Sequence, residues 1–177
     1  GNTDLATLTG FEFSAEHDIS CCLTAFALAS YIEGRDHSRS APSRIGNLIR
    51  EDFGVFGAPR SRVAGVNEEP LPGIPPLEAR LGCRYHEPVE FPTWAIELEA
   101  RIVDGQDQVA ATLFEEPTGG FTIWNVRSYW QATDKLLLIA GVENFTDQFY
   151  REHLDYRSGR GVFRPGINFY FSTELRY

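Results

Sequence analysis

Five side chains near the C-terminus are of the types, and at the spacing, that could hold a metal chelate: Tyr150, Arg151, His153, Tyr156 and Arg157. Phenol and imidazole groups can ligate iron, and guanidinium groups can bind an anionic chelate. The alternative is a loop that packs against its neighbours, and the residues by themselves favour this plainer interpretation. We therefore treat the five residues as a candidate ligand-binding cluster on a loop.

A second set of cationic side chains lies in the segment Arg35–Gly73. These side chains could receive an anionic ligand or the phosphates of lipopolysaccharide, although a solvated loop explains them more simply. The arginines are Arg35, Arg39, Arg44, Arg50, Arg60 and Arg62.

No pattern in the chain predicts catalysis, a metal site or a cofactor. The four histidines are scattered, without a nucleophile and a carboxylate at a recognisable spacing. Cys21, Cys22 and Cys83 lack the spacing of a metal site, so we interpret them as small apolar side chains on strands. We expect a protein that is not an enzyme.

Composition narrows the class of protein further. The 177 residues carry a net charge of −9, and 42% are hydrophobic and 13% aromatic. An acidic chain lacks the clustered cations that nucleic acid requires. No apolar run approaches the roughly 18 residues of a transmembrane helix. The chain has no Met, even at position 1, and no secretion signal at its start, so we expect a piece of a longer protein.

The elements that must position these residues are strands, because apolar and polar residues alternate with a period of two. In Leu77–Tyr85 the odd residues are apolar, while Glu78, Arg80 and Arg84 fall on the opposite face. No proline interrupts the interior of a predicted strand. The seven predicted strands are Leu5–Phe13, Ile19–Tyr31, Leu77–Tyr85, Trp94–Ile102, Thr122–Trp130, Lys135–Phe145 and Ile167–Tyr177.

The predicted connections alternate strictly between short and long. The short ones are Ala15–Asp18, His86–Phe91 and Gln131–Asp134, and the long ones are Arg35–Gly73, Gln106–Gly120 and Thr146–Arg164. Barrels of the bacterial outer membrane have short periplasmic turns and long extracellular loops. A soluble sandwich has no reason to keep its long loops on every second connection.

Aromatic residues end the strands that run towards the short turns, which is typical of side chains at a membrane interface. These residues are Phe13, Tyr85, Trp130 and Tyr177. The opposite, charged face would be the water-filled lumen of a barrel, or the surface of a soluble protein. The polarity of this face is compatible with either a barrel or a soluble protein. The alternation of loop lengths and the aromatic strand ends favour the barrel.

The C-terminal half resembles the end of TonB-dependent outer-membrane receptors. The stretch LLLIAGVENFTDQFYREHLDYR, Leu136–Arg157, contains the pattern G-[VL]-x-N-[LF]-[FT]-D-x-x-Y, which is similar to the family's penultimate strand. The stretch RPGINFYFSTELRY, Arg164–Tyr177, is similar to its closing strand, although Ile167 replaces the usual Arg after Pro-Gly. PLPGIPPLEARLGCRY, Pro70–Tyr85, and the segment Leu8–Asp36 resemble earlier parts of the same barrel.

The resemblance implies an all-β, antiparallel, up-and-down transmembrane barrel of about 22 strands closed around a plug. Residues 1–177 would be the last seven strands, without the plug. The implied function is energised uptake of a siderophore, haem or cobalamin across the outer membrane. The implied partners are outer-membrane lipid, the barrel-assembly machinery and, through an N-terminal region outside this sequence, the TonB complex.

Two groups of residues near the C-terminus have candidate roles. Asn144 and Asp147 would turn the chain by bonding to nearby backbone N–H groups, with ligand contact as the alternative. Phe169, Phe171, Leu175 and Tyr177 would carry the terminal signal for barrel assembly, or would simply be interface side chains. Two other functions stay open: a passive porin or structural barrel, and a soluble β-sandwich that binds a ligand.

Overall fold

One antiparallel sheet contains every strand in the described part of the chain. The structure is a computed structural model that describes residues 5–37, 69–158 and 162–177. Its strands are β1 (Ala6–Ser20), β2 (Leu23–Asp36), β3 (Glu69–Pro70), β4 (Glu78–His86), β5 (Trp94–Val103), β6 (Phe121–Thr133), β7 (Leu136–Glu143) and β8 (Asn168–Leu175). Two short 3-10 helices, η1 (Ala111–Leu113) and η2 (His153–Ser158), lie in the connections.

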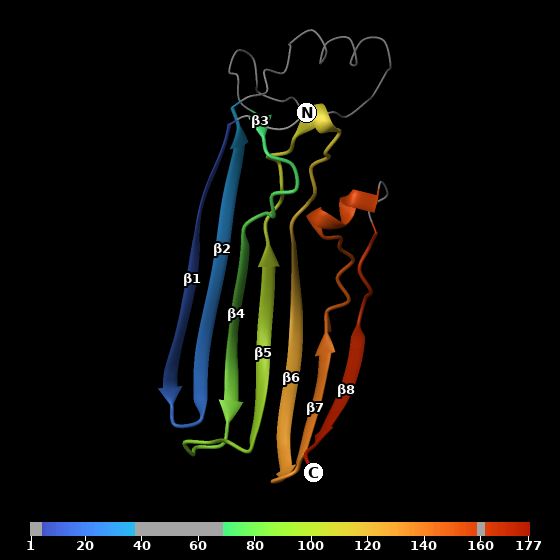
Figure 1. Cartoon of the computed structure of the whole chain (residues 1–177). Helices are drawn as coiled ribbons and strands as arrows, with labels where there is room; N and C mark the ends of the chain where they lie inside the picture. The colour runs from blue at the N-terminus through green and yellow to red at the C-terminus, as the bar shows by residue number, and fades with distance from the viewer. Residues whose placement is uncertain (1–4, 38–68, 159–161) are drawn as a thin grey trace.

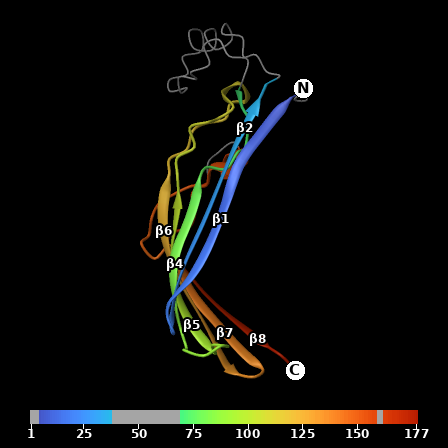
Figure 2. The ribbon, with the colours of Figure 1, turned by 90° about the vertical axis from the view of Figure 1, so that its left-hand side faces the viewer.

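The sheet is an up-and-down meander that curves into part of a barrel. Its strand order is β1-β2-β4-β5-β6-β7-β8, and the short β3 pairs only with β2 (Figure 1). Viewed along the sheet, β1 and β8 bend towards the same side (Figure 2). The predicted all-β, antiparallel, partial barrel is therefore confirmed, with β3 as an additional strand. None of the helices in the described ranges has the length and apolarity to cross a membrane.

The alternation of short and long connections is also present. Cys21–Cys22, Glu87–Thr93 and Asp134–Lys135 join strands at one end, and residues 37–77, 104–120 and 144–167 join them at the other (Figure 1). Most of the arginine-bearing segment Arg35–Gly73 lies outside the described residues. Its two ends pair with each other, Arg35 opposite Pro70 and Asp36 opposite Glu69.

The first hairpin differs from the sequence prediction. We expected the turn at Ala15–Asp18, but β1 continues to Ser20 and the turn is Cys21–Cys22. Polar residues such as Glu16 and Asp18 are typical of turns, yet here they pair with Phe26 and Thr24 of β2. The interpretation of Cys21 and Cys22 as strand residues was therefore wrong, while Cys83 does lie in β4.

Because the first hairpin is longer than expected, one of the predicted interface aromatics lies far from the turn. Phe13 pairs with Ala29, well away from the turn, so it does not lie at the short-turn end. Tyr85 and Trp130 do lie there. The Tyr85 ring is 5.6 Å from that of Trp94, between ring centroids, and Trp94 is directly opposite Trp130.

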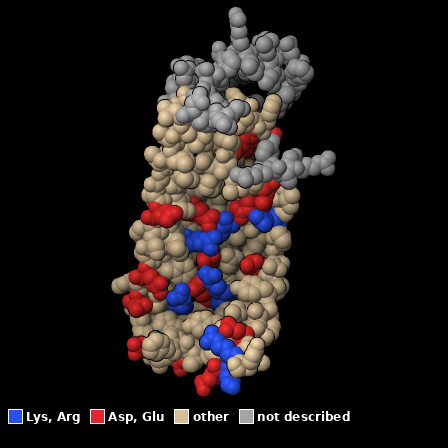
Figure 3. Space-filling model, in the orientation of Figure 1, with Lys and Arg blue, Asp and Glu red and all other residues tan. Residues whose placement is uncertain are grey.

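The two faces of the sheet are inverted relative to those of a water-soluble protein. On β5 the carboxylate residues Glu97 and Glu99 are 7% and 5% exposed, whereas Ile96 is 50% exposed. The acidic and basic side chains share the concave face, which we call the inner face (Figure 3). On the convex outer face, apolar side chains are open, and no second layer of the described chain covers them. On β5 the charged face is therefore the protected one.

Two glycines on the inner face make room for aromatic rings. A Cβ at Gly82 would overlap the ring of Phe26 and the carbonyl oxygen of Leu98, and a Cβ at Gly141 would overlap the ring of Tyr170. Each aromatic ring therefore fills a gap on the neighbouring strand, which keeps adjacent strands close where the sheet curves.

Substituting Gly82 tests this close packing. We expect Gly82→Ala to lower the free energy of unfolding in lipid or detergent by about 1–3 kcal/mol, because neither the Leu98 carbonyl nor the Phe26 ring can give way freely. Gly119→Ala is the matched control, since nothing lies within 4 Å of its Cβ position. Denaturant titration measures both variants. Equal stability of the two would contradict the proposed packing.

Candidate functional site

The candidate site is the band of charges across the inner face of β4, β5 and β6. Register places Glu97 directly between Arg84 of β4 and Arg127 of β6. Glu99 is opposite Gly82 and Asn125, and Arg101 is opposite Arg80. Because side chains on one face of a sheet repeat every second residue, these groups form a continuous charged surface.

The part of this surface nearest the short turns is organised by two buried carboxylates. Glu97 accepts hydrogen bonds from Arg84 at 3.1 Å and from Arg127. Glu99 accepts from Asn125 at 3.2 Å and from Arg127 at 3.1 Å. A carboxylate with so little solvent needs paired donors to stay charged. Arg127 keeps 52% of its side chain exposed, so it remains accessible from the inner face.

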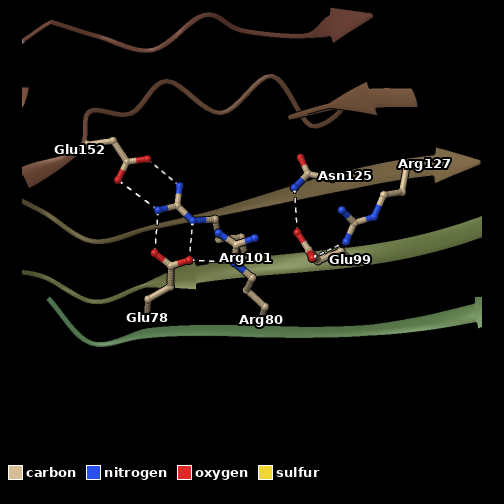
Figure 4. A network of polar contacts seen from close by, with 7 residues as sticks. All are labelled: Glu78, Arg80, Glu99, Arg101, Asn125, Arg127 and Glu152. Atoms are coloured by element: carbon tan, nitrogen blue, oxygen red, sulfur yellow. Dashed lines mark hydrogen bonds and ion pairs between the residues drawn. The ribbon is translucent and has the colours of Figure 1, made fainter. Parts of the chain in front are cut away.

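The part nearest the long loops is organised by Arg101. Its guanidinium binds Glu78 through two hydrogen bonds, of 2.9 and 2.7 Å, and Glu152 through two more, of 2.6 and 3.2 Å (Figure 4). Arg80 donates to the same Glu78 oxygen at 2.9 Å. Glu152 belongs to the connection between β7 and β8, so Arg101 fastens that loop to the wall of the sheet.

Beside these charges lies a groove of about 590 Å³, which opens onto β1 and β2. Glu12, Glu16, Glu78, Arg80 and Arg84 are among its lining residues. Glu16 accepts a hydrogen bond from Arg84 at 3.1 Å, so the first hairpin is tied to the same charge network. A hydrated groove with both signs of charge can hold a polar surface of a partner or a polar solute.

One member of the candidate ligand cluster, Tyr150, packs against the sheet. The Tyr150 ring packs on Phe121, with 4.2 Å between centroids, next to the small core of Val103, Phe121 and Ile123. Burial, reinforced by the charge of Glu152, raises the pKa of the Tyr150 phenol above its ordinary value. Arg151 is half-buried. Tyr156 and Arg157 lie in η2, and their side chains are outside the described part of the structure.

His153 lies deepest of the cluster, and its imidazole is held from both sides. Its Nδ1 is 2.9 Å from the hydroxyl of Thr118, and its Nε2 is 3.2 Å from Glu115. Only 2% of the side chain is exposed. In this arrangement the imidazole joins two long connections and does not face solvent.

Sequence reasoning missed the residues that fasten the long connections together. Glu115 accepts from the backbone N–H groups of Gly73 and Ala110, both at 2.7 Å, in addition to His153. Glu69 of β3 accepts from the backbone N–H of Thr112 at 2.8 Å. Except for Ala110 and Glu115, these partners are far apart in the chain, and no local motif marks them.

Asn144 and Asp147 shape the chain where it leaves β7. Both have positive φ, 51° and 53°, a conformation that Asn and Asp tolerate better than most residues. The buried Asn144 side chain accepts from the backbone N–H of Gln148 and donates to its carbonyl, both at 2.9 Å. Asp147 accepts from the backbone N–H of Ile167 at 3.3 Å, which links this turn to the start of β8.

The side chains expected to carry the assembly signal lie on β8 and just beyond it. Phe169 and Phe171 pair with Val142 and Ala140 on the outer face, and Leu175 pairs with Leu136. All three, and Tyr177, are exposed. Within the described residues β8 pairs with β7 alone, so one of its edges is open.

Removing the charge of Glu152 tests whether Arg101 holds the last long loop. We expect Glu152→Gln to cost about 1–3 kcal/mol locally, because it weakens hydrogen bonds between charged groups that are largely screened from solvent. Hydrogen exchange of residues 144–158 should become faster. Glu174→Gln is the control, because the pair Glu174–Arg176 is exposed and should contribute less than about 1 kcal/mol. Unchanged exchange in Glu152→Gln would show that other contacts hold the loop.

Comparison with known proteins agrees with this geometry. The profile of a family described as "TonB dependent receptor-like, beta-barrel" matches residues 1–145. A search of curated proteins found no match. Among solved structures, the fold is similar to "Copper transporter OprC", with 23% identity, a TM-score of 0.70, and coverage of 96% of this chain and 23% of that one.

Other similar structures are siderophore receptors. The ferric yersiniabactin uptake receptor FyuA from Yersinia pestis has 14% identity and a TM-score of 0.57, with 96% of this chain and 23% of that chain covered. The siderophore receptor PiuA from Acinetobacter baumannii has 12% identity and a TM-score of 0.54, with 97% and 22% covered.

The chain thus spans about a quarter of the length of these structures, and at such identities the likeness concerns the fold. The family consists of outer-membrane receptors and transporters rather than enzymes. With a family profile that covers most of its length and a curved sheet of the same fold, the chain belongs to the TonB-dependent receptor-like β-barrel family.

Proposed function

We propose that this chain is the C-terminal wall of an outer-membrane receptor that takes up a scarce nutrient with energy from the TonB complex. The observation that carries the proposal is the inversion of the two faces, with buried Glu97 and Glu99 on the inner face and open Leu98 and Trp130 on the outer face. A barrel in lipid needs this arrangement, because hydrocarbon replaces water outside and water fills the lumen.

The proposal includes the partners that such a wall requires. Outer-membrane lipid would cover the outer face, where all three tryptophans of the chain lie. The barrel-assembly machinery would act on the β8 side chains Phe169, Phe171 and Leu175, together with Tyr177. A plug would fill the lumen, and the TonB complex would engage a region outside this sequence.

The cargo would be a small metal chelate or cofactor, such as a siderophore, haem or cobalamin. Similar structures include siderophore receptors and a copper transporter, so metal uptake is the shared theme of those proteins. Within the candidate cluster we propose two roles. Tyr150 and His153 would position the loop, because they pack against the wall and the neighbouring connection. Arg151, Tyr156 and Arg157 would meet the ligand.

A matched pair of substitutions tests the membrane orientation. Leu81 on the outer face of β4 is 48% exposed, and Leu28 on the inner face of β2 is 43% exposed. We expect Leu81→Arg to cost about 2–4 kcal/mol, because it places a charge in hydrocarbon near the middle of β4. Leu28→Arg should cost little, because it faces the hydrated groove that Glu12 and Glu78 also line.

The amount of heat-modifiable, folded protein in outer membranes reports the effect of each change, and urea titration in lipid vesicles gives its size. In a soluble β-sandwich Leu81 would face a second sheet, so Leu81→Arg would be costly there as well, but the wild type would then fold in water without lipid or detergent. That result would exclude the membrane orientation.

A transport assay separates energised uptake from a passive porin. The full-length protein is expressed in cells without other receptors and is supplied with radiolabelled ferric siderophores, haem or cobalamin. We expect uptake of one of these cargoes, and its loss when TonB is deleted, because a plugged barrel opens only with energy input. Uptake that continues without TonB would favour the porin. A variant with Arg151→Ala, together with Tyr156→Phe as a milder change, should raise the cargo concentration at half-maximal uptake.

A further inference from the structure

Two adjacent cysteines form the tip of the first hairpin. Cys21 and Cys22 are the whole turn between β1 and β2, and both carry free thiols. Their Sγ atoms point towards each other at 3.9 Å. Cys21 is exposed and Cys22 is half-buried, so the pair is open to small solutes.

The turn is held in place on both sides. The carbonyl oxygen of Cys22 accepts a hydrogen bond from the backbone N–H of His86 at 3.0 Å, which ties the turn to the end of β4. The Ser20 hydroxyl oxygen is 3.5 Å from the backbone N of Cys22 and 3.8 Å from its Sγ. Just behind the turn, Thr24 donates to Asp18 at 2.6 Å. These contacts keep the two sulfur atoms near each other without a bond between them.

A disulfide between the two residues is unfavourable. Adjacent Cα atoms are about 3.8 Å apart across a trans peptide, whereas disulfides join Cα atoms roughly 4.4–6.8 Å apart. A bridge here would be strained and easily reduced. The stable form of the pair is therefore two thiols, which leaves two soft donors side by side.

The spacing of the sulfur atoms suits one metal ion bound to both. With metal–sulfur bonds of about 2.3 Å, a separation of 3.9 Å gives a sulfur–metal–sulfur angle of about 116°. This angle is close to the ~120° of a three-coordinate ion, with a small solute at the open end of the turn as the third ligand. Within the described ranges, no group of three or more His, Cys, Asp or Glu side chains could hold a metal ion. Zn²⁺, which takes four ligands in structural sites, would therefore be held poorly.

We propose that Cys21 and Cys22 form a two-thiolate site for a soft monovalent metal ion, Cu(I). Thiolates select Cu(I) over hard cations, and Cu(I) accepts two or three ligands. Binding replaces the two thiol protons: one Cu(I) ion and two thiols give one negatively charged dithiolate complex and two released protons. No oxidant is required, because the sulfur atoms and the metal keep their oxidation states.

The release of protons makes the site dependent on pH. A thiol must lose its proton to bind a metal ion, so acidification opposes metal binding. Affinity for Cu(I) should fall as the pH is lowered.

The test uses the full-length protein in detergent, under anaerobic and reducing conditions, with Cu(I) itself as the probe and a chromogenic Cu(I) chelator as competitor. We expect Cys21→Ser/Cys22→Ser to hold one Cu(I) fewer per chain than the wild type. The affinity for Cu(I) should fall by more than roughly 10–100-fold, which is the loss expected when a group that only hydrogen-bonds to a metal ligand is removed. Cys83→Ser is the matched control, because Cys83 lies alone on the outer face of β4, and it should bind as the wild type does.

A second measurement follows the thiols directly. Cu(I), or Ag(I) as a redox-inert substitute, should protect Cys21 and Cys22 from alkylation by a maleimide, while Zn²⁺ should not. Heat-modifiability of each variant shows that the barrel has folded. Equal Cu(I) binding in Cys21→Ser/Cys22→Ser would overturn the proposal, and so would equal protection by Zn²⁺ or a Cys21–Cys22 disulfide in the purified protein. The proposed uptake function stands or falls separately, because its test does not involve these residues.

Discussion

The structure depends on the neutralisation of two buried carboxylates on β5. Glu97 and Glu99 lie on the concave face with little contact with water, and an unpaired charge in such a place is strongly destabilising. Arg84 and Arg127 flank Glu97 on the two neighbouring strands, and Asn125 faces Glu99. A slip of one residue between β5 and either neighbour would turn one set of charges to the outer face. The strand register therefore brings the charged partners together, and the charge pairs in turn stabilise that register.

The same interactions connect the wall to the long loops. Arg101 continues the charged row of β5 but reaches out of the sheet to Glu152. Glu115 then joins three connections, through Gly73, Ala110 and His153. A ligand that met these loops would meet a surface already ordered by the wall, which lowers the entropy lost on binding. The groove below them opens onto the same charges.

At the end of the sheet that carries the short turns, aromatic rings rather than charges are prominent. Tyr85, Trp94 and Trp130 place aromatic rings on the outer face, where a membrane interface favours them. The turn between β4 and β5 is held by hydrogen bonds. Glu87, for example, accepts from both the backbone N–H and the hydroxyl of Thr93, which lowers the pKa of its carboxyl. The cysteine pair lies at this ordered end, with its sulfur atoms open to solutes.

The sequence by itself determined the kind of fold, because alternation with a period of two is a local property. It predicted the strands near Leu77–Tyr85, Trp94–Ile102 and Ile167–Tyr177, the alternation of short and long connections, and the segregation of charges onto one face. It failed where local signals conflict, as at Glu16–Asp18, whose turn-like residues pair with β2 instead.

The tertiary structure alone decided which face is protected and which side chains meet. Glu97 and Glu99 are buried beside the arginines of neighbouring strands, and the ring of Phe26 on β2 occupies the space next to Gly82 on β4. The partnership of Arg101 with Glu152 joins residues 51 positions apart, and that of His153 with Glu115 joins residues 38 positions apart. Such pairs depend on how far each long connection folds back, which no local pattern of residues encodes.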